Sequence, residues 1–188
     1  MLNQNNNTRN IVLVTMVLAA IAMRLVNTQF PALSNFTPVG AVALFGGAYF
    51  TDKWKAYVVP LVALFISDMI INYMYAGKFS FYNSSLFMYA CFMLMVWVGT
   101  LIKKVTALNV IAASVLSVMI HWLVMDLPFV YGMPNTWHNY GTLLLRAIYP
   151  FETNMLIGDA IYGAILFGGF ELAKSKYTFL RAERQLAL

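Results

Sequence analysis

Long runs of apolar residues constrain the fold of this chain more than any other feature of its sequence. A lipid bilayer has a hydrocarbon core about 30 Å thick, which requires roughly 20 apolar residues per helix. Runs near that length predict helices at 11–26, 38–50, 54–75, 84–102, 107–125 and 150–173. The run at 38–50 is short, which indicates a tilted or partly re-entrant segment. We therefore predict an all-α integral membrane protein, a six-helix transmembrane bundle that forms one domain over residues 1–188.

The composition supports this prediction and excludes several classes of protein. Hydrophobic residues make up 61% of the chain and charged residues 10%, whereas a soluble domain has about 25% charged residues. The net charge of +5 comes from scattered residues and not from a basic patch with interleaved aromatics, so we expect the lipid bilayer and not nucleic acid as a partner. Spacings typical of metal, P-loop or dinucleotide sites are absent, and we expect no cofactor.

The positive charges predict an orientation in the membrane. Cytoplasmic loops are enriched in lysine and arginine. With the N-terminus inside, the inner side carries Arg9, Lys53, Lys55, Lys103, Lys104, Lys174, Lys176, Arg181 and Arg184. The outer side carries Arg24, Lys78 and Arg146. This bias places both termini in the cytoplasm.

Polar residues gather in the outer half of the predicted bundle. The rise of a helix puts Asp68 about 21 Å along its run from the inner side, and an aromatic loop at 126–146 resembles a lid over a ligand site. We therefore predict an outward-facing binding site closed by that loop. Its candidate residues are Arg24, Asp68, Asn72, Cys91, His121, Trp137, Tyr140, Arg146, Asp159 and Tyr162.

Structural roles remain open for the same residues. A buried Asp–Arg pair can lock two helices together, and His121 can serve as an interhelical hydrogen-bond partner. Trp137 and Tyr140 also suit an interfacial aromatic belt. The glycine pairs at 46–47 and 168–169 predict close contacts between helices. Asp68 and Asp159 could also form an acid–base pair, which would make the chain an intramembrane aspartyl enzyme.

The chain resembles a family of short bacterial membrane proteins. The resemblance lies in NFTPVGAVALFGGAYF at 35–50, in Pro60-Leu61 and Ser67-Asp68, and in the stretch 154–171 with Gly158-Asp159 and Phe167-Gly168. It covers the chain from about residue 24 to residue 171. That family is similar to the substrate-binding S-components of energy-coupling-factor (ECF) vitamin transporters.

The resemblance implies six helices in a bacterial inner membrane, both termini in the cytoplasm, and uptake of a vitamin or similar small molecule. Such S-components are energised by a module of a transmembrane coupling protein and ATPases. They usually carry an Ala-xxx-Ala pattern on the first helix, where this chain has Thr15 and Ala19. A solitary transporter is therefore an alternative, and solitary members of the class handle cobalamin, whose cobalt the Cys91 thiolate could ligate. An accessory subunit of a larger membrane complex is another alternative.

The charge bias generates the first testable prediction. Topology reporters fused after Leu188 and inserted within residues 134–140 are expected to report opposite sides of the membrane, because both termini are predicted inside. If both fusions report the cytoplasm, the orientation and the outward-facing site are wrong together.

Overall fold

The computed structural model describes residues 2–27, 29–79 and 84–181, and within these ranges it contains helices and no strand. Arg184, counted among the inner cations, lies outside these ranges. The first five α-helices are α1 Leu2–Asn27, α2 Val39–Tyr49, α3 Lys53–Ala76, α4 Ser85–Thr100 and α5 Ala107–Met125. The last part of the chain contains α6 Trp137–Ala147, the kinked segment η3 Ile148–Glu152, α7 Thr153–Gly163, π-helical η4 Ala164–Gly168 and α8 Gly169–Lys176. Short 3₁₀ turns are η1 Pro31–Leu33, η2 Pro128–Tyr131 and η5 Thr178–Leu180.

The helices lie close to where the apolar runs place them. The bounds of α5 equal the predicted range, and those of α2, α3 and α4 fall within two residues of it. Helix α1 begins nine residues before the predicted start, because its backbone stays helical through the polar N-terminal residues. The predicted helix at 150–173 corresponds to α7 to α8, which follow a break at Tyr149, where the backbone is extended.

The prediction of a loop at 126–146 requires a correction, because half of that segment is helical. Helix α6 begins after Thr136, whose side chain accepts a hydrogen bond from the Asn139 N–H at 3.2 Å and so caps the helix. The Tyr140 hydroxyl donates to the Leu123 carbonyl at 2.8 Å, and the Trp122 indole donates to the Leu144 carbonyl at 3.0 Å. These bonds fix α6 against the end of α5.

Four helical stretches of the described chain are long and apolar enough to cross a membrane. They are Asn6–Val26, Lys53–Ala76, Ala107–Met125 and Trp137–Lys176. Helices α2 and α4 are also apolar but shorter. Large apolar side chains cover the outside of the bundle, such as Leu86 at 74% and Leu108 at 75% exposure. These features are compatible with a multi-pass membrane protein.

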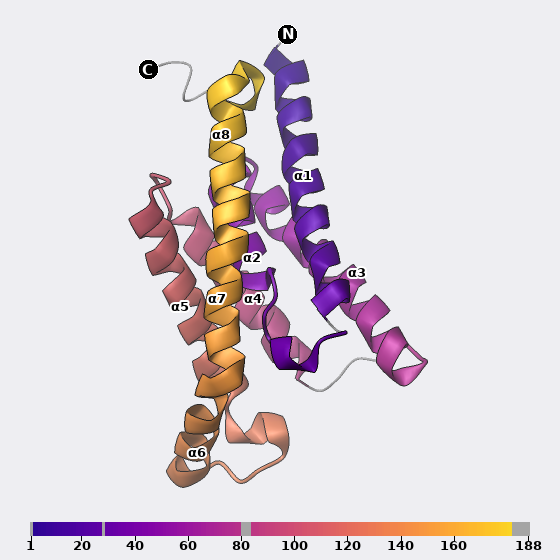
Figure 1. The fold of residues 1–188 in the computed structure, drawn as a ribbon, viewed down its shortest axis with the longest axis vertical. Coiled ribbons are helices and arrows are strands. Elements are labelled where there is room, and N and C mark those ends of the chain that lie inside the picture. Colours follow the sequence, from indigo (N-terminus) through magenta and orange to yellow (C-terminus); the bar gives the residue numbers. More distant parts are fainter. Residues whose placement is uncertain (1, 28, 80–83, 182–188) are drawn as a thin grey trace.

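The helices form one bundle with two different ends (Figure 1). At one end α1 contacts η5, where the buried Arg9 donates hydrogen bonds to the Leu180 and Tyr49 carbonyls. We call this the terminal end. The opposite end carries α6, and we call it the α6 end.

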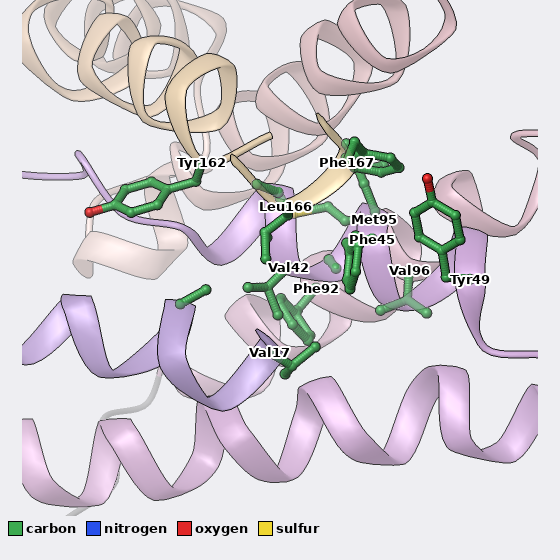
Figure 2. Close-up of a cluster of buried hydrophobic side chains, with 14 of the residues drawn as sticks. Val17, Val42, Phe45, Tyr49, Phe92, Met95, Val96, Tyr162, Leu166 and Phe167 are labelled. Atoms are coloured by element: carbon green, nitrogen blue, oxygen red, sulfur yellow. The ribbon is translucent and has the colours of Figure 1, made fainter. Parts of the chain in front are cut away.

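Helix α2 lies in the centre of the bundle and packs against α1, α3, α4, α5 and α7. Residues Gly40 to Gly47 are all buried. The Phe45 ring meets Phe167 edge to face, with centroids 5.5 Å apart (Figure 2). Helices α2 and α4 touch backbone to backbone, since a Cβ on Gly47 would overlap the Val96 carbonyl and one on Gly99 would overlap Leu44. The expectation of a close contact is therefore right for 46–47.

The second glycine pair does not make the contact that we expected. A Cβ on Gly168 or on Gly169 would meet no atom within 4 Å. Both residues lie at the junction of η4 and α8. The expectation fails there because neither position touches another helix.

This difference yields a matched pair of substitutions. Gly99→Ala is expected to destabilise the protein by about 1–3 kcal/mol, because the added methyl would overlap the Leu44 backbone. Gly169→Ala is expected to leave stability unchanged or raise it by up to about 1 kcal/mol, because alanine is the better helix former. Unfolding of both variants in detergent measures the difference. Equal effects would contradict the packing of α2 against α4.

Candidate functional site

One face of α7 holds the segment that precedes α2. The Asn154 side-chain amide donates to the carbonyls of Ala32 at 3.0 Å and Ser34 at 2.9 Å. One turn further on, Gly158 lies against the backbone of Thr37, where a Cβ would be 3.0 Å from the carbonyl oxygen. The segment is thereby fixed against α7 at the N-terminal end of α2.

Asp159 continues this face and caps α2. Its Oδ1 accepts the Ala41 N–H at 2.8 Å, one of the N–H groups that have no partner within the helix. A carboxylate is also favoured at the positive end of a helix. Gly40 allows the close approach, since a Cβ there would overlap the carboxylate. Asp159 is fully buried, and its Oδ2 has no partner in the described part of the chain.

Two neighbouring chambers lie between this segment and the α6 end. The deep chamber, of about 100 Å³, begins at the first residue of α2. It is lined by Arg24, Asn35, Thr37, Val39, Leu64, Met88, Cys91, Phe92, Met95, His121 and Met155. The wide chamber, of about 390 Å³, is lined by Asn35, His121, Met125, Asp126, Tyr131, Leu143, Arg146, Ala147, Phe151 and Glu152. Asn35 and His121 belong to both.

Asn35 stands at this junction with an uncommon backbone. Its φ is 62°, in the left-handed region, which asparagine tolerates better than most residues with a Cβ. The Thr37 N–H bonds the Asn35 carbonyl at 2.8 Å, which tightens the turn. The turn places an amide residue where the two chambers meet.

The polar side of the deep chamber joins α1, α3 and α4. Arg24 Nη1 donates to Ser67 Oγ and to Asp68 Oδ1, each at 2.6 Å. The Tyr89 hydroxyl donates to Asp68 Oδ2 at 2.9 Å. Arg24 Nε is buried and has no hydrogen-bond partner among the described residues. Arg24 therefore brings a charge balanced by Asp68 and one unused donor to this chamber.

The wide chamber combines two carboxyl groups with two basic side chains. His121 Nδ1 lies 2.9 Å from Glu152 Oε1, while Glu152 Oε2 is buried with no partner in the described chain. The Tyr131 hydroxyl donates to Asp126 Oδ1 at 3.3 Å. Burial raises the pKa of Asp126, and the nearby Glu152 raises it further. Arg146 is exposed and forms no ion pair with another described residue.

Four of the residues proposed from the sequence line these chambers: Arg24, Cys91, His121 and Arg146. The contact of His121 with Glu152 is also the interhelical hydrogen bond considered as its alternative role. Asp68 lines neither chamber, but its Oδ1 accepts a hydrogen bond from Arg24, which does.

The other proposed residues line neither chamber. Asn72 lies one turn beyond Asp68 on α3, and Trp137 is 89% exposed at the start of α6. The Tyr140 hydroxyl instead donates a hydrogen bond to a backbone carbonyl of α5. Tyr162 is buried against Phe36, with ring centroids 5.8 Å apart. Asp159 does not border this cavity, because its carboxylate is turned to the N-terminus of α2.

The chamber residues that were not proposed include three with polar side chains, Asp126, Glu152 and Asn35. Asp126 and Glu152 share the depth of the other polar residues in the sequence, and this signal could have identified them. Asn35 is part of SNFTP, where a cluster of serine, asparagine, threonine and proline indicates a loop. Its place between two chambers depends on where α2 begins, which the sequence leaves open.

The comparisons with known proteins identify a family. A family model described as "Family of unknown function (DUF6580)" matches residues 4–183. The chain therefore belongs to the DUF6580 family. No curated protein and no solved structure is detectably similar to it.

The raised pKa of Asp126 predicts that the stability of the fold depends on pH. A carboxyl whose pKa is higher in the folded than in the unfolded protein stabilises the fold below its ordinary pKa of about 3.9, and this contribution is lost as pH rises through the raised pKa. Asp126→Asn stays neutral, so its melting temperature in detergent is expected to exceed that of wild type increasingly from acid to neutral pH. A difference that is constant with pH, or of opposite sign, would contradict the burial of this carboxyl.

Proposed function

We propose that this member of the DUF6580 family is a multi-pass membrane protein that binds a small molecule in the two chambers, as the substrate-binding component of an uptake system. One observation carries the proposal. The two chambers share Asn35 and His121 in their linings and are lined by polar groups from several helices. Binding sites commonly are pockets with apolar walls and a few convergent polar groups.

The distribution of charge supports an orientation for this binding protein. Among the described lysines and arginines, only Arg24, Lys78 and Arg146 lie at helix ends that point toward the α6 end, where α1, α3 and α6 finish. By the positive-inside rule, the terminal end faces the cytoplasm of a bacterial inner membrane. The chambers then open outward, on the side from which a nutrient arrives.

The chamber linings favour a ligand with both acidic and basic or hydrogen-bonding groups. The wide chamber offers carboxyl oxygens from Asp126 and Glu152, and the Arg146 guanidinium. The deep chamber adds methionine and phenylalanine side chains, which suit an apolar part of the ligand. A vitamin-sized molecule with polar substituents fits this combination.

The volumes favour a ligand smaller than cobalamin. The deep chamber, which contains Cys91, has about 100 Å³, the volume of roughly three water molecules in the liquid. A chamber of this volume gives no support to a corrin ring whose cobalt contacts the thiol. Cys91 Sγ is also 4.0 Å from the Ile120 carbonyl, in a buried contact between α4 and α5. Packing is therefore the role we assign to Cys91.

The sequence has no P-loop motif, so ATP-driven uptake would need a partner such as an ECF energising module. A solitary transporter remains the alternative within the same proposal, and both forms use the same chambers.

An intramembrane aspartyl enzyme receives no geometric support. An acid–base pair needs two carboxyl groups that meet at one site. Asp68 instead pairs with Arg24, and Asp159 bonds the Ala41 N–H of α2. The two aspartates thus have separate partners on different helices.

Mass spectrometry of small molecules that copurify with the protein tests the proposal and identifies the ligand. Arg146→Gln is expected to weaken its binding roughly ten- to hundredfold, because a hydrogen bond to a charged group contributes about 1.5–3 kcal/mol. Lys78→Gln is the matched control, since it removes a cation near the same end without touching the chambers. Equal binding by both variants would contradict a site in the wide chamber.

A further inference from the structure

A second polar cavity lies at the terminal end, away from the two chambers. It has a volume of about 410 Å³ and lies where α2 ends, between the α4–α5 connection and α8. Its lining includes four basic residues and one acidic residue: Arg9, Lys103, Lys104, Lys174 and Glu171. We call it the basic cavity.

The positive charge of the basic cavity is not balanced within the described protein. Lys174 Nζ pairs with Glu171 Oε1 at 2.7 Å, and the Tyr49 hydroxyl donates to the same oxygen at 2.6 Å. Arg9 is 5% exposed, and its hydrogen bonds go to the carbonyls of Leu180 and Tyr49. Lys103 and Lys104 are exposed and form no described ion pair. Three cations therefore remain without a carboxylate.

An apolar groove lies beside this cavity and extends along the bundle. It has a volume of about 480 Å³ and lies between α5 and the stretch from α7 to α8. Val105 and Glu171 belong to both the groove and the basic cavity. Leu156 and Glu171 lie at its two ends on α7 and α8, about 22 Å apart at 1.5 Å per residue. The groove is therefore longer than the apolar depth of one membrane leaflet, which is about 15 Å, half of the bilayer core.

We infer that the basic cavity and the groove together bind one anionic phospholipid, with its phosphate in the cavity and an acyl chain in the groove. The shape of the paired sites carries the inference, because a free phosphate would use the cavity and leave the groove empty. Basic pockets at the cytoplasmic ends of membrane helices attract anionic headgroups. The inference rests on the membrane embedding in the proposed function but not on uptake or on the chambers.

Native mass spectrometry of the purified protein with phosphatidylglycerol, and separately with phosphatidylcholine, tests this site. Wild type is expected to retain phosphatidylglycerol preferentially. The double variant Lys103→Gln with Lys104→Gln is expected to bind it about thirtyfold more weakly, at about a factor of five per cation. The control double variant Lys53→Gln with Lys176→Gln removes two cations from the terminal end outside the cavity and is expected to bind as wild type does.

Two further arms separate a lipid from other occupants. Gly163→Leu would project into the groove, and its Cβ would meet only the Val110 side chain, at 3.9 Å. It is expected to reduce phosphatidylglycerol binding while its melting temperature stays that of wild type. Inorganic phosphate is expected to bind far more weakly than the lipid and to be unaffected by Gly163→Leu.

The outcomes that overturn the inference are distinct. Equal retention of the two lipids, or equal losses of binding in the test and control double variants, would contradict a specific lipid site. Attraction by the general positive charge of the surface would then explain the binding. Phosphate binding as tight as lipid binding would make the cavity a site for a free anion, and a dimer formed through the groove would make it a protein interface. Failure of the chamber ligand to depend on Arg146 would overturn the proposed function and leave the lipid result standing.

Discussion

The short, buried helix α2 is the constraint on which the rest of this structure depends. Its 11 residues rise about 16 Å, roughly half the thickness of a bilayer core. One end of α2 must therefore stop inside the bundle, where its free N–H groups need partners that water would otherwise supply. Asp159 provides one of them through the Ala41 N–H. The space that α2 does not reach, beyond Val39, is the deep chamber.

Two kinds of contact hold the helices together: close backbone packing around α2 and polar side-chain contacts toward the α6 end. Around α2, the glycines Gly47 and Gly99 let backbones meet directly, so dispersion between close surfaces stabilises the centre. Toward the α6 end, Figure 1 shows α3 leaning away from the bundle. There Arg24 of α1 joins Asp68 of α3, and Tyr89 of α4 joins the same carboxylate. A buried ion pair adds little net stability because both charges lose hydration, but it keeps polar groups beside a chamber that apolar packing would have closed.

The sequence predicts the positions of the helices well because apolar burial is a local signal, and α5 coincides with its run at 107–125. It fails for α6, where aromatic residues suggested a loop although Thr136 and Asn139 repeat the capping spacing of Thr106 and Asn109 before α5. The site was only partly predictable. The position of a residue along its helix indicates which polar residues lie at the same depth in the bundle. The direction in which each side chain points depends on how the helix is rotated about its axis and on partners distant in sequence. Asp159 has the depth of the chambers but meets α2, which no pattern within its own helix could reveal.

The π-helical turn η4 explains how one helix holds both ends of α2. Glu171 follows Asp159 by twelve residues, and in a regular α-helix at about 100° per residue the two would face directions about 120° apart. A π turn bonds residue i to i+5 and so absorbs one extra residue, which brings the two within about 20° of the same direction. Both carboxylates then reach α2, Asp159 at the Ala41 N–H and Glu171 at the Tyr49 hydroxyl. Their axial separation of about 16–18 Å matches the length of α2. The π turn therefore sets the register between α2 and the stretch from α7 to α8, which borders a polar cavity at each end of α2.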